Sequence, residues 1–170
     1  MKKLYVAKIL EVDPYSSESP DHIVDAYLTL KLDDSLILKC FVPDWRTVFP
    51  YLPKPSKWGL GKTLINNLKQ KKITMSFKFI DLKPIQLCKK HDVIIIQKYG
   101  EYTKICGKII EKISHSEFDS LFVDCGIIVQ VNCNKGSFSL NDFIETSGIL
   151  NAYIVEIVDK PTRKEINNEK

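Results

Sequence analysis

Apolar and polar residues alternate along much of this chain, as they do in β-strands that bury one face. Other runs are apolar and rich in β-branched residues, which is typical of strands covered on both faces. The pattern predicts about eight strands and a mostly β protein, with antiparallel sheets curled into one or two small, OB-like barrels. The runs are residues 4–12, 24–32, 36–42, 73–79, 93–97, 103–113, 121–131 and 150–158.

The second and third runs predict a hairpin. They are separated by residues 33–35, whose sequence Asp-Asp-Ser favours a turn. With a turn at this place, Tyr27 is expected opposite Phe41, and Thr29 opposite Lys39. All four side chains would then lie on the outer face of the hairpin.

Two of the runs are long. Residues 121–131 alternate without a break, and we interpret them as a single strand. In residues 103–113, three isoleucines are expected on the buried face and three lysines on the opposite face. These residues are Ile105, Ile109 and Ile113, and Lys104, Lys108 and Lys112.

One short helix is predicted near residues 60–70, where leucines recur at a spacing of four. Lys69, Lys71 and Lys72 are expected to close its C-terminal end, because cations complement the helix dipole there. The preceding residues 42–59 are rich in proline and aromatic side chains, which predicts an irregular loop that packs onto the fold.

A weak internal repeat accompanies these elements. The sequence Ala-Lys-Ile-Leu-Glu at residues 7–11 resembles Gly-Lys-Ile-Ile-Glu at residues 107–111, and each opens a long predicted strand. Two β-rich units would explain the similarity, and a single domain is the alternative. The expected units are residues 1–85 and 86–160, followed by a frayed tail over 161–170; the single domain would span residues 1–160.

Charge is distributed unevenly along the 170 residues, whose formal net charge is +4. Residues 1–53 hold 6 basic and 8 acidic side chains, residues 54–98 hold 11 and 2, and residues 99–170 hold 8 and 11. The balances of −2, +9 and −3 sum to +4. A basic central segment favours an anionic partner. No apolar run approaches the roughly 20 residues that a membrane helix needs, so we expect a cytoplasmic protein without membrane contact.

Five cysteines are present, and their spacing does not resemble a disulfide framework, which suits a reducing compartment. Structural zinc sites usually bring paired ligands at short spacing. The segment Cys-Lys-Lys-His at residues 88–91 supplies only half of such a motif, with Cys106 and His115 elsewhere. We therefore expect free thiols, no metal site and no cofactor.

The sequence Gly-Leu-Gly-Lys-Thr at residues 59–63 ends like a phosphate-binding loop. A phosphate-binding loop requires a further glycine at the position where this chain has Ser56. Such a loop also follows a buried strand, and no strand is predicted directly before residue 59. Pairs of acidic groups placed for general acid–base chemistry are not evident either. The prediction is a non-catalytic protein, and a small-molecule ligand is not expected.

The basic segment carries the main functional prediction. Lysines neutralise phosphates, and aromatic faces stack on unpaired bases, so their combination favours single-stranded nucleic acid. The outer face of the predicted hairpin would add to this surface. The candidate residues are Tyr27, Lys39, Phe41, Trp45, Arg46, Lys57, Trp58, Lys62, Lys69, Lys71 and Lys72. The alternative is a protein-binding module, such as an inhibitor or a toxin-neutralising immunity protein, with the proline- and aromatic-rich loop as its anchor.

Overall fold

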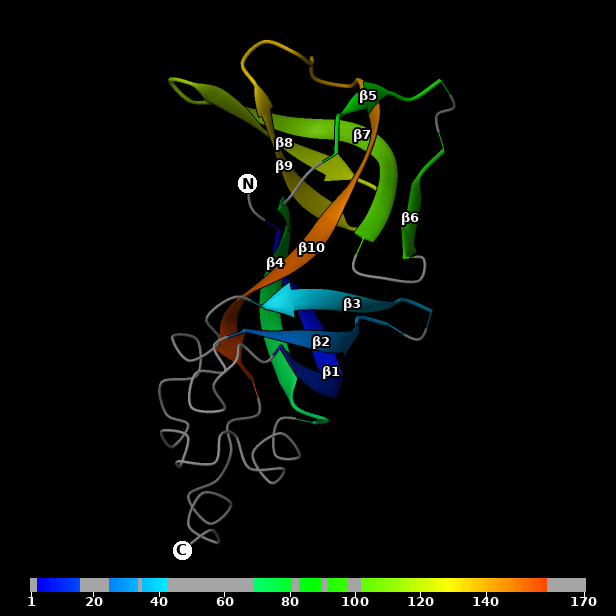
Figure 1. Ribbon diagram of the computed structural model, residues 1–170, viewed down its shortest axis with the longest axis vertical. Coiled ribbons are helices and arrows are strands. Elements are labelled where there is room, and N and C mark those ends of the chain that lie inside the picture. Colours follow the sequence, from blue (N-terminus) through cyan, green and yellow to red (C-terminus); the bar gives the residue numbers. More distant parts are fainter. Residues whose placement is uncertain are drawn as a thin grey trace, which may run out of the picture. The chain divides into compact units, whose positions relative to one another are not determined.

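A computed structural model of the chain describes residues 3–15, 25–33, 35–42, 69–80, 83–89, 92–97 and 102–158 (Figure 1). Strands make up 72% of these residues, and none of them lies in a helix. The prediction of a mostly β protein is therefore confirmed. The strands form one mixed sheet rather than a purely antiparallel one.

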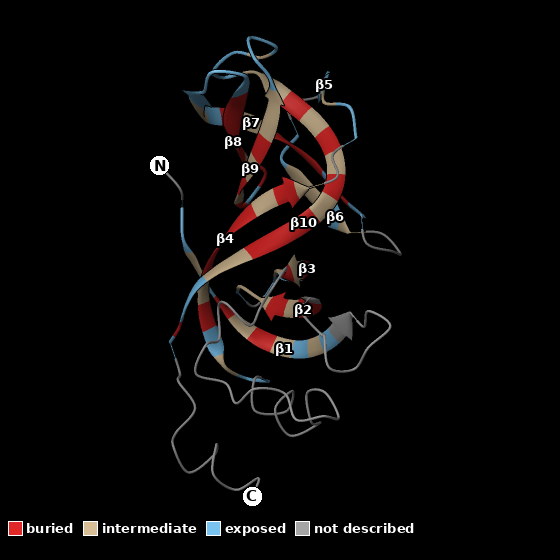
Figure 2. Cartoon of the chain, turned by 60° about the vertical axis from the view of Figure 1, so that its left-hand side comes forward, coloured by how far each residue is buried: buried red, intermediate tan, exposed pale blue. Residues whose placement is uncertain are grey.

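Ten strands occur in the described residues. They are β1 (Tyr5–Tyr15), β2 (Asp25–Lys31), β3 (Ile37–Val42), β4 (Lys72–Ile80), β5 (Gln86–Leu87), β6 (Ile94–Gln97), β7 (Tyr102–Ser114), β8 (Phe118–Asp124), β9 (Ile128–Asn134) and β10 (Phe143–Ile157). Their order in the sheet is β5-β10-β3-β2-β1-β4-β9-β8-β7-β6, with further pairings of β10 to β4 and to β7. Figure 2 shows buried and more exposed positions following one another along these strands.

The chain divides into two compact units. Unit 1 comprises Met1–Lys3 and Ser76–Asn151, and unit 2 comprises Leu4–Met75 and Ala152–Lys170. The division falls inside β4 and β10, so each of these strands contributes residues to both units. The predicted domains, residues 1–85 and 86–160, are segments that we expect to fold on their own. They stay a prediction.

Unit 2 is built around the antiparallel strands β1, β2 and β3, with the start of β4 paired to β1. Its core consists of side chains that point to one face of these strands. Ile9, Leu30, Cys40 and Ile73 are fully buried there. Val158, just after β10, donates from its backbone N–H to the carbonyl oxygen of Lys72.

Unit 1 repeats this plan. β7, β8 and β9 are antiparallel neighbours, and the start of β10 pairs with β7. The C-terminal part of β4 runs parallel to β9, with Phe77 opposite Val129. Ile105, Ile109 and Leu121 are fully buried in its core. The short strands β5 and β6 lie beside β10 and β7 and have no counterpart in the described part of unit 2.

The two sequence stretches that resemble each other also share a structural irregularity. In β1 the pairing with β2 shifts between Ile9 and Glu11, and in β7 the pairing with β8 shifts between Ile109 and Glu111. A β-bulge inserts one extra residue in this way and bends the strand. Both units therefore place a bulge at the same point of the same strand pattern.

The hairpin prediction is confirmed to the residue. Tyr27 lies opposite Phe41 and Thr29 opposite Lys39. The turn is held by the Asp33 carboxylate, which accepts hydrogen bonds from the backbone N–H groups of Ser35 and Leu36, both 2.8 Å long. These bonds, with a third from the Ser35 hydroxyl, hold the pKa of Asp33 below its usual value. A side chain that caps its own turn fixes the strand register.

Two strand predictions are wrong. Residues 121–131 form parts of two strands, β8 and β9, joined by a turn at Gly126, whose φ is 97°. In β7 the bulge inserts one extra residue. Each side chain after the bulge therefore lies on the opposite face of the strand from the one that strict alternation predicts. Ile113 is consequently 41% exposed, whereas the Lys112 side chain is only 24% exposed.

Most of the predicted helix, residues 60–68, lies outside the described residues. Its last two positions, Lys69 and Gln70, form a turn, and Lys72 opens β4. The helix, and the closing of its C-terminal end by Lys69, Lys71 and Lys72, therefore stay a prediction. Gln70 has a φ of 70°, in the left-handed region, which a right-handed helix does not continue through.

Candidate anion-binding face

Three lysines lie directly opposite one another on neighbouring strands of unit 2. Lys8 of β1 is the register partner of Lys31 on β2 and of Lys72 on β4. Register partners in antiparallel strands share a face, and here the adjacent residues Ile9 and Leu30 are fully buried on the other face. Lys8, Lys31 and Lys72, called the lysine row below, therefore lie on the outer face and span roughly 10 Å across three strands.

Two more lysines lie in the turn that leads into β4. The backbone carbonyl of Lys71 accepts a hydrogen bond of 2.8 Å from the N–H of Ile9, and the N–H of Gln70 donates to the carbonyl of Ile9 at 2.6 Å. These bonds hold the turn beside β1. Lys69 is exposed and Lys71 is half-buried, so the positive charge of the lysine row extends into this turn.

An aromatic pair lies on the same face of β2 and β3. The ring centroids of Tyr27 and Phe41 are 5.2 Å apart, with 54° between their planes. The Lys39 ammonium lies 5.2 Å from the Tyr27 centroid and 3.2 Å from the Asp13 carboxylate. We call Asp13, Tyr27, Lys39 and Phe41 the aromatic cluster.

The exposure of the two rings differs, although both were predicted to be on the outside. Tyr27 is 8% exposed and hence buried, whereas Phe41 is half-buried. Phe41 is therefore the more accessible ring of the pair. Because Lys31 and Tyr27 are four residues apart on β2, the lysine row and the aromatic cluster are separated by roughly 13 Å along one face.

The same positions of unit 1 have different chemistry. Lys108 corresponds to Lys8, since each comes one residue before the isoleucine that starts the bulge. The register partners of Lys108 are Asp124 and Phe143 instead of two lysines. The strand pattern itself therefore does not require three lysines in a row.

The structure brings together Tyr27, Lys39 and Phe41, and separately Lys69, Lys71 and Lys72. Lys8 and Lys31 join the candidate site from strands far from the basic segment. Lys8 lies on a strand whose outer face the alternation did not mark clearly. The remaining predicted site residues, Trp45, Arg46, Lys57, Trp58 and Lys62, lie outside the described residues, as does the glycine-rich segment 59–63.

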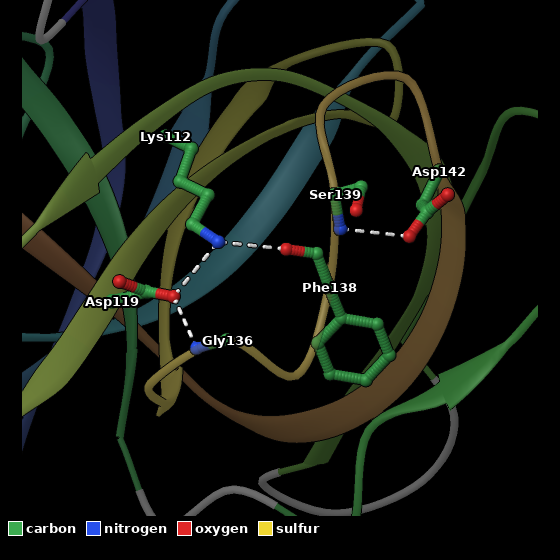
Figure 3. A network of polar contacts seen from close by, with 6 residues as sticks. All are labelled: Lys112, Asp119, Gly136, Phe138, Ser139 and Asp142. Carbon is green, nitrogen blue, oxygen red and sulfur yellow. Dashed lines mark hydrogen bonds and ion pairs between the residues drawn. The ribbon is translucent and has the colours of Figure 1, made fainter.

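A buried ion pair in unit 1 is a second feature that could carry chemistry (Figure 3). The Asp119 side chain is 1% exposed, and its Oδ2 lies 2.9 Å from the Lys112 ammonium and accepts a bond of 2.8 Å from the N–H of Gly136. The hydrogen bonds from Gly136, Lys112 and Ser114 lower the pKa of Asp119 to about 2. This carboxylate is therefore ionised at neutral pH and does not donate protons.

The surroundings of the ion pair indicate a structural role. Lys112 also donates to the carbonyl of Phe138 at 2.9 Å, and the N–H of Ser139 donates to Asp142 at 2.8 Å (Figure 3). The first contact attaches the connection between β9 and β10 to the end of β7, and the second stabilises the connection internally. A perturbed carboxylate can mark an active site, but structural ion pairs perturb pKa values in the same way.

A third feature is a cavity of about 690 Å³ in unit 1. Its lining residues on β6, β7 and β10 share one face of these strands, and the others come from β5 and from the residues that flank β5 and β6. It combines apolar side chains with the ion pair of Lys104 and Glu145, whose charged atoms are 3.2 Å apart. The sequence did not predict it. Its lining residues are Gln86, Leu87, Cys88, Lys89, Asp92, Ile94, Ile96, Tyr102, Lys104, Cys106, Glu145 and Ser147.

All five cysteines are free thiols. Burial raises the pKa of Cys125 to about 12, and burial together with the neighbouring Cys88 thiol raises that of Cys106 to about 12. A thiol with a raised pKa is a poor nucleophile. Among the residues with described positions, no three His, Cys, Asp or Glu side chains are grouped as a metal site requires.

Comparison with known proteins finds no family model and no curated protein that matches this chain. In the part of the chain that the structure describes, no helix is long and apolar enough to cross a membrane.

Proposed function

We propose that this protein is a non-catalytic binding protein for a polyanion, and that the polyanion is single-stranded nucleic acid. The observation that carries the proposal is the lysine row, in which Lys8 has a lysine as its register partner on both sides. Like charges directly opposite each other repel, and here three ammonium groups lie on one face. An anionic ligand on this face would be attracted by all three of them.

Phosphates are the anions that fit this arrangement best. Neighbouring phosphates of a nucleic acid strand form a repeating series of charges, and lysines that neutralise them release condensed counterions. The aromatic cluster supports a single strand over a duplex, because its Phe41 ring lies on the same face and could stack on an unpaired base. Bases within a duplex are stacked on each other and cannot use such a ring.

We also propose that each unit is a small OB-like barrel. In support, the pairings of unit 2 follow β4-β1-β2-β3, and β10 neighbours β3 and also pairs with β4. In OB-folds, the second and third strands form the surface that binds oligonucleotides. The aromatic cluster lies on the second and third strands of unit 2, where this proposal requires the ligand.

Direct binding tests the proposal. Fluorescence anisotropy would compare a labelled 12-nucleotide single-stranded DNA with the same sequence as a duplex, at ~50 mM salt where electrostatic contacts are strong. We expect saturable binding of the single strand and weaker binding of the duplex. The absence of single-strand binding to both DNA and RNA under these conditions would refute the proposed function.

A second candidate function, binding of a protein partner such as a toxin, is supported by the cavity of unit 1. Leu87 is 62%, Ile96 40% and Tyr102 40% exposed there. Apolar and aromatic side chains in a hollow are typical anchoring points of protein interfaces. Purification of the tagged protein with and without nuclease separates the two functions, since only a protein partner would remain bound after nuclease treatment.

A further inference from the structure

The face that carries the aromatic cluster in unit 2 has a counterpart in unit 1. Tyr27 of β2 is the register partner of Asp13 on β1 and of Phe41 on β3. At the same distance from the bulge in unit 1, Ser120 of β8 is the partner of Ile113 on β7 and of Asn132 on β9.

The chemistry of this counterpart is uncharged and dominated by amides. Asn132 takes the place of Phe41, and Gln130 takes the place of Lys39. The Ser120 hydroxyl donates to Asn132 Oδ1 at 3.1 Å, and Gln130 Nε2 donates to the Ser120 hydroxyl at 3.3 Å and to Asn132 Oδ1 at 3.4 Å. Ser120 is 2% exposed, so a buried hydroxyl holds both amides in place.

One end of each amide is left for a ligand. In the part of the chain with described positions, the Asn132 Nδ2 donor and the Gln130 Oε1 acceptor make no hydrogen bond, because all bonds of these side chains are the three given above. Both side chains are half-buried. A fixed donor and a fixed acceptor on one face match the hydrogen-bonding edge of a nucleobase, which carries both kinds of group.

A stacked ring pair lies beside the amides. The rings of His115 and Phe118 are 4.4 Å apart with 26° between their planes, and Phe118 is 37% exposed. The His115 Nε2 atom is 3.1 Å from the Ser120 hydroxyl, which links the ring pair to the amides. An exposed ring face next to fixed hydrogen-bonding groups is how proteins hold unstacked bases.

We propose that this face of unit 1, formed by His115, Phe118, Ser120, Gln130 and Asn132, binds an unpaired nucleobase. The proposal rests on the proposed function, and it assigns different tasks to the two units. The lysine row of unit 2 contacts phosphates, and its contribution to affinity falls with salt. The amide face of unit 1 carries no charge at Gln130 or Asn132, so its contribution depends on the base and not on salt.

The test uses the whole 170-residue chain and two labelled single strands. One is a 12-nucleotide DNA, and the other has the same backbone with abasic sites throughout. Wild-type protein should bind the base-containing strand at least 5-fold more tightly. The variant Phe118→Ala should lose about 5-fold to 150-fold in affinity for that strand, the effect of removing one base stack. The double variant Gln130→Ala with Asn132→Ala should weaken the same complex. Both variants should bind the abasic strand like wild type, with an unchanged salt dependence.

The variant Ser137→Ala, which removes an exposed polar side chain between β9 and β10, is the control and should bind like wild type. Thermal unfolding of each variant would separate a loss of the ligand contact from a loss of the fold. If Phe118→Ala and the double variant bind the base-containing strand as tightly as wild type, this inference is wrong while the proposed function stands. If wild type binds neither strand, the proposed function fails as well.

Discussion

Gln70 and Asn141 occupy the same position in the two units and adopt the same rare backbone conformation. Their φ values are 70° and 72°. The N–H of Gln70 donates to the carbonyl of Ile9 at 2.6 Å, and the N–H of Asn141 donates to the carbonyl of Ile109 at 2.9 Å. Each residue therefore docks the segment before β4 or β10 onto the bulge of the partner strand. This match supports one strand pattern used twice.

The shared backbone conformation predicts that substitution by glycine changes the stability of the protein differently at Gln70 and at Asn141. A left-handed φ costs an ordinary residue roughly 1–2 kcal/mol, whereas asparagine tolerates it and glycine adopts it freely. Gln70→Gly should therefore stabilise the protein by about 0.5–1 kcal/mol, after the greater freedom of glycine in the unfolded chain is subtracted. Asn141→Gly should give no gain. Urea unfolding of both variants measures this difference, and a larger gain at Asn141 would contradict it.

The Asp119 carboxylate predicts a pH-dependent stability. Its pKa of about 2 lies below the value of about 3.9 for an unfolded chain, so the ionised form stabilises the folded state above pH ~4. This contribution is lost as the pH falls from about 4 to about 2. The difference between the urea midpoints of wild type and Asp119→Asn should be largest at pH 7 and should decrease below pH 4. Glu117→Gln, at an exposed position, is the control, and a gap that stays constant down to pH 2 would show that the carboxylate is not responsible.

The unequal exposure of the aromatic cluster predicts which ring contacts a base. Phe41→Ala should weaken binding of single-stranded DNA by about 5-fold to 150-fold, because a stacked base loses its partner. Tyr27→Phe keeps the buried ring and should leave the affinity unchanged. Anisotropy titrations at one salt concentration measure both effects. Equal affinities of Phe41→Ala and wild type would exclude stacking at this position.

Much of the fold could be predicted because it depends on local chemistry. The β2–β3 hairpin was predicted with its register, since the turn residue Asp33 and the alternation on both sides agree. The turn at Gly126 was missed because Cys125 and Ile127 keep the apolar alternation through it and are both buried. The signal was present in the Asp124 side chain, which accepts a hydrogen bond from the Gly126 N–H at 3.1 Å.

Two further features depend on how strands pair and were not accessible to local patterns. The bulge at Ile110 reverses the faces of β7, and only the pairing with β8 reveals it. The lysine row combines residues from positions 8, 31 and 72, and two of these lie in the N-terminal segment, whose net charge is −2. Counting charge along the chain therefore pointed to the segment around Lys69 and Lys72 but not to Lys8.

The salt dependence of single-strand binding tests the lysine row most directly. Each phosphate contact contributes roughly −0.7 to the slope of log affinity against log salt concentration. The triple variant Lys8→Gln, Lys31→Gln and Lys72→Gln should have a slope shallower than wild type by about 2. The control Lys83→Gln, Lys89→Gln and Lys135→Gln removes the same charge from exposed positions of unit 1. We expect a shallow slope for the first variant and a nearly unchanged slope for the control. Equal slopes for the two variants would contradict a phosphate-binding role of the lysine row.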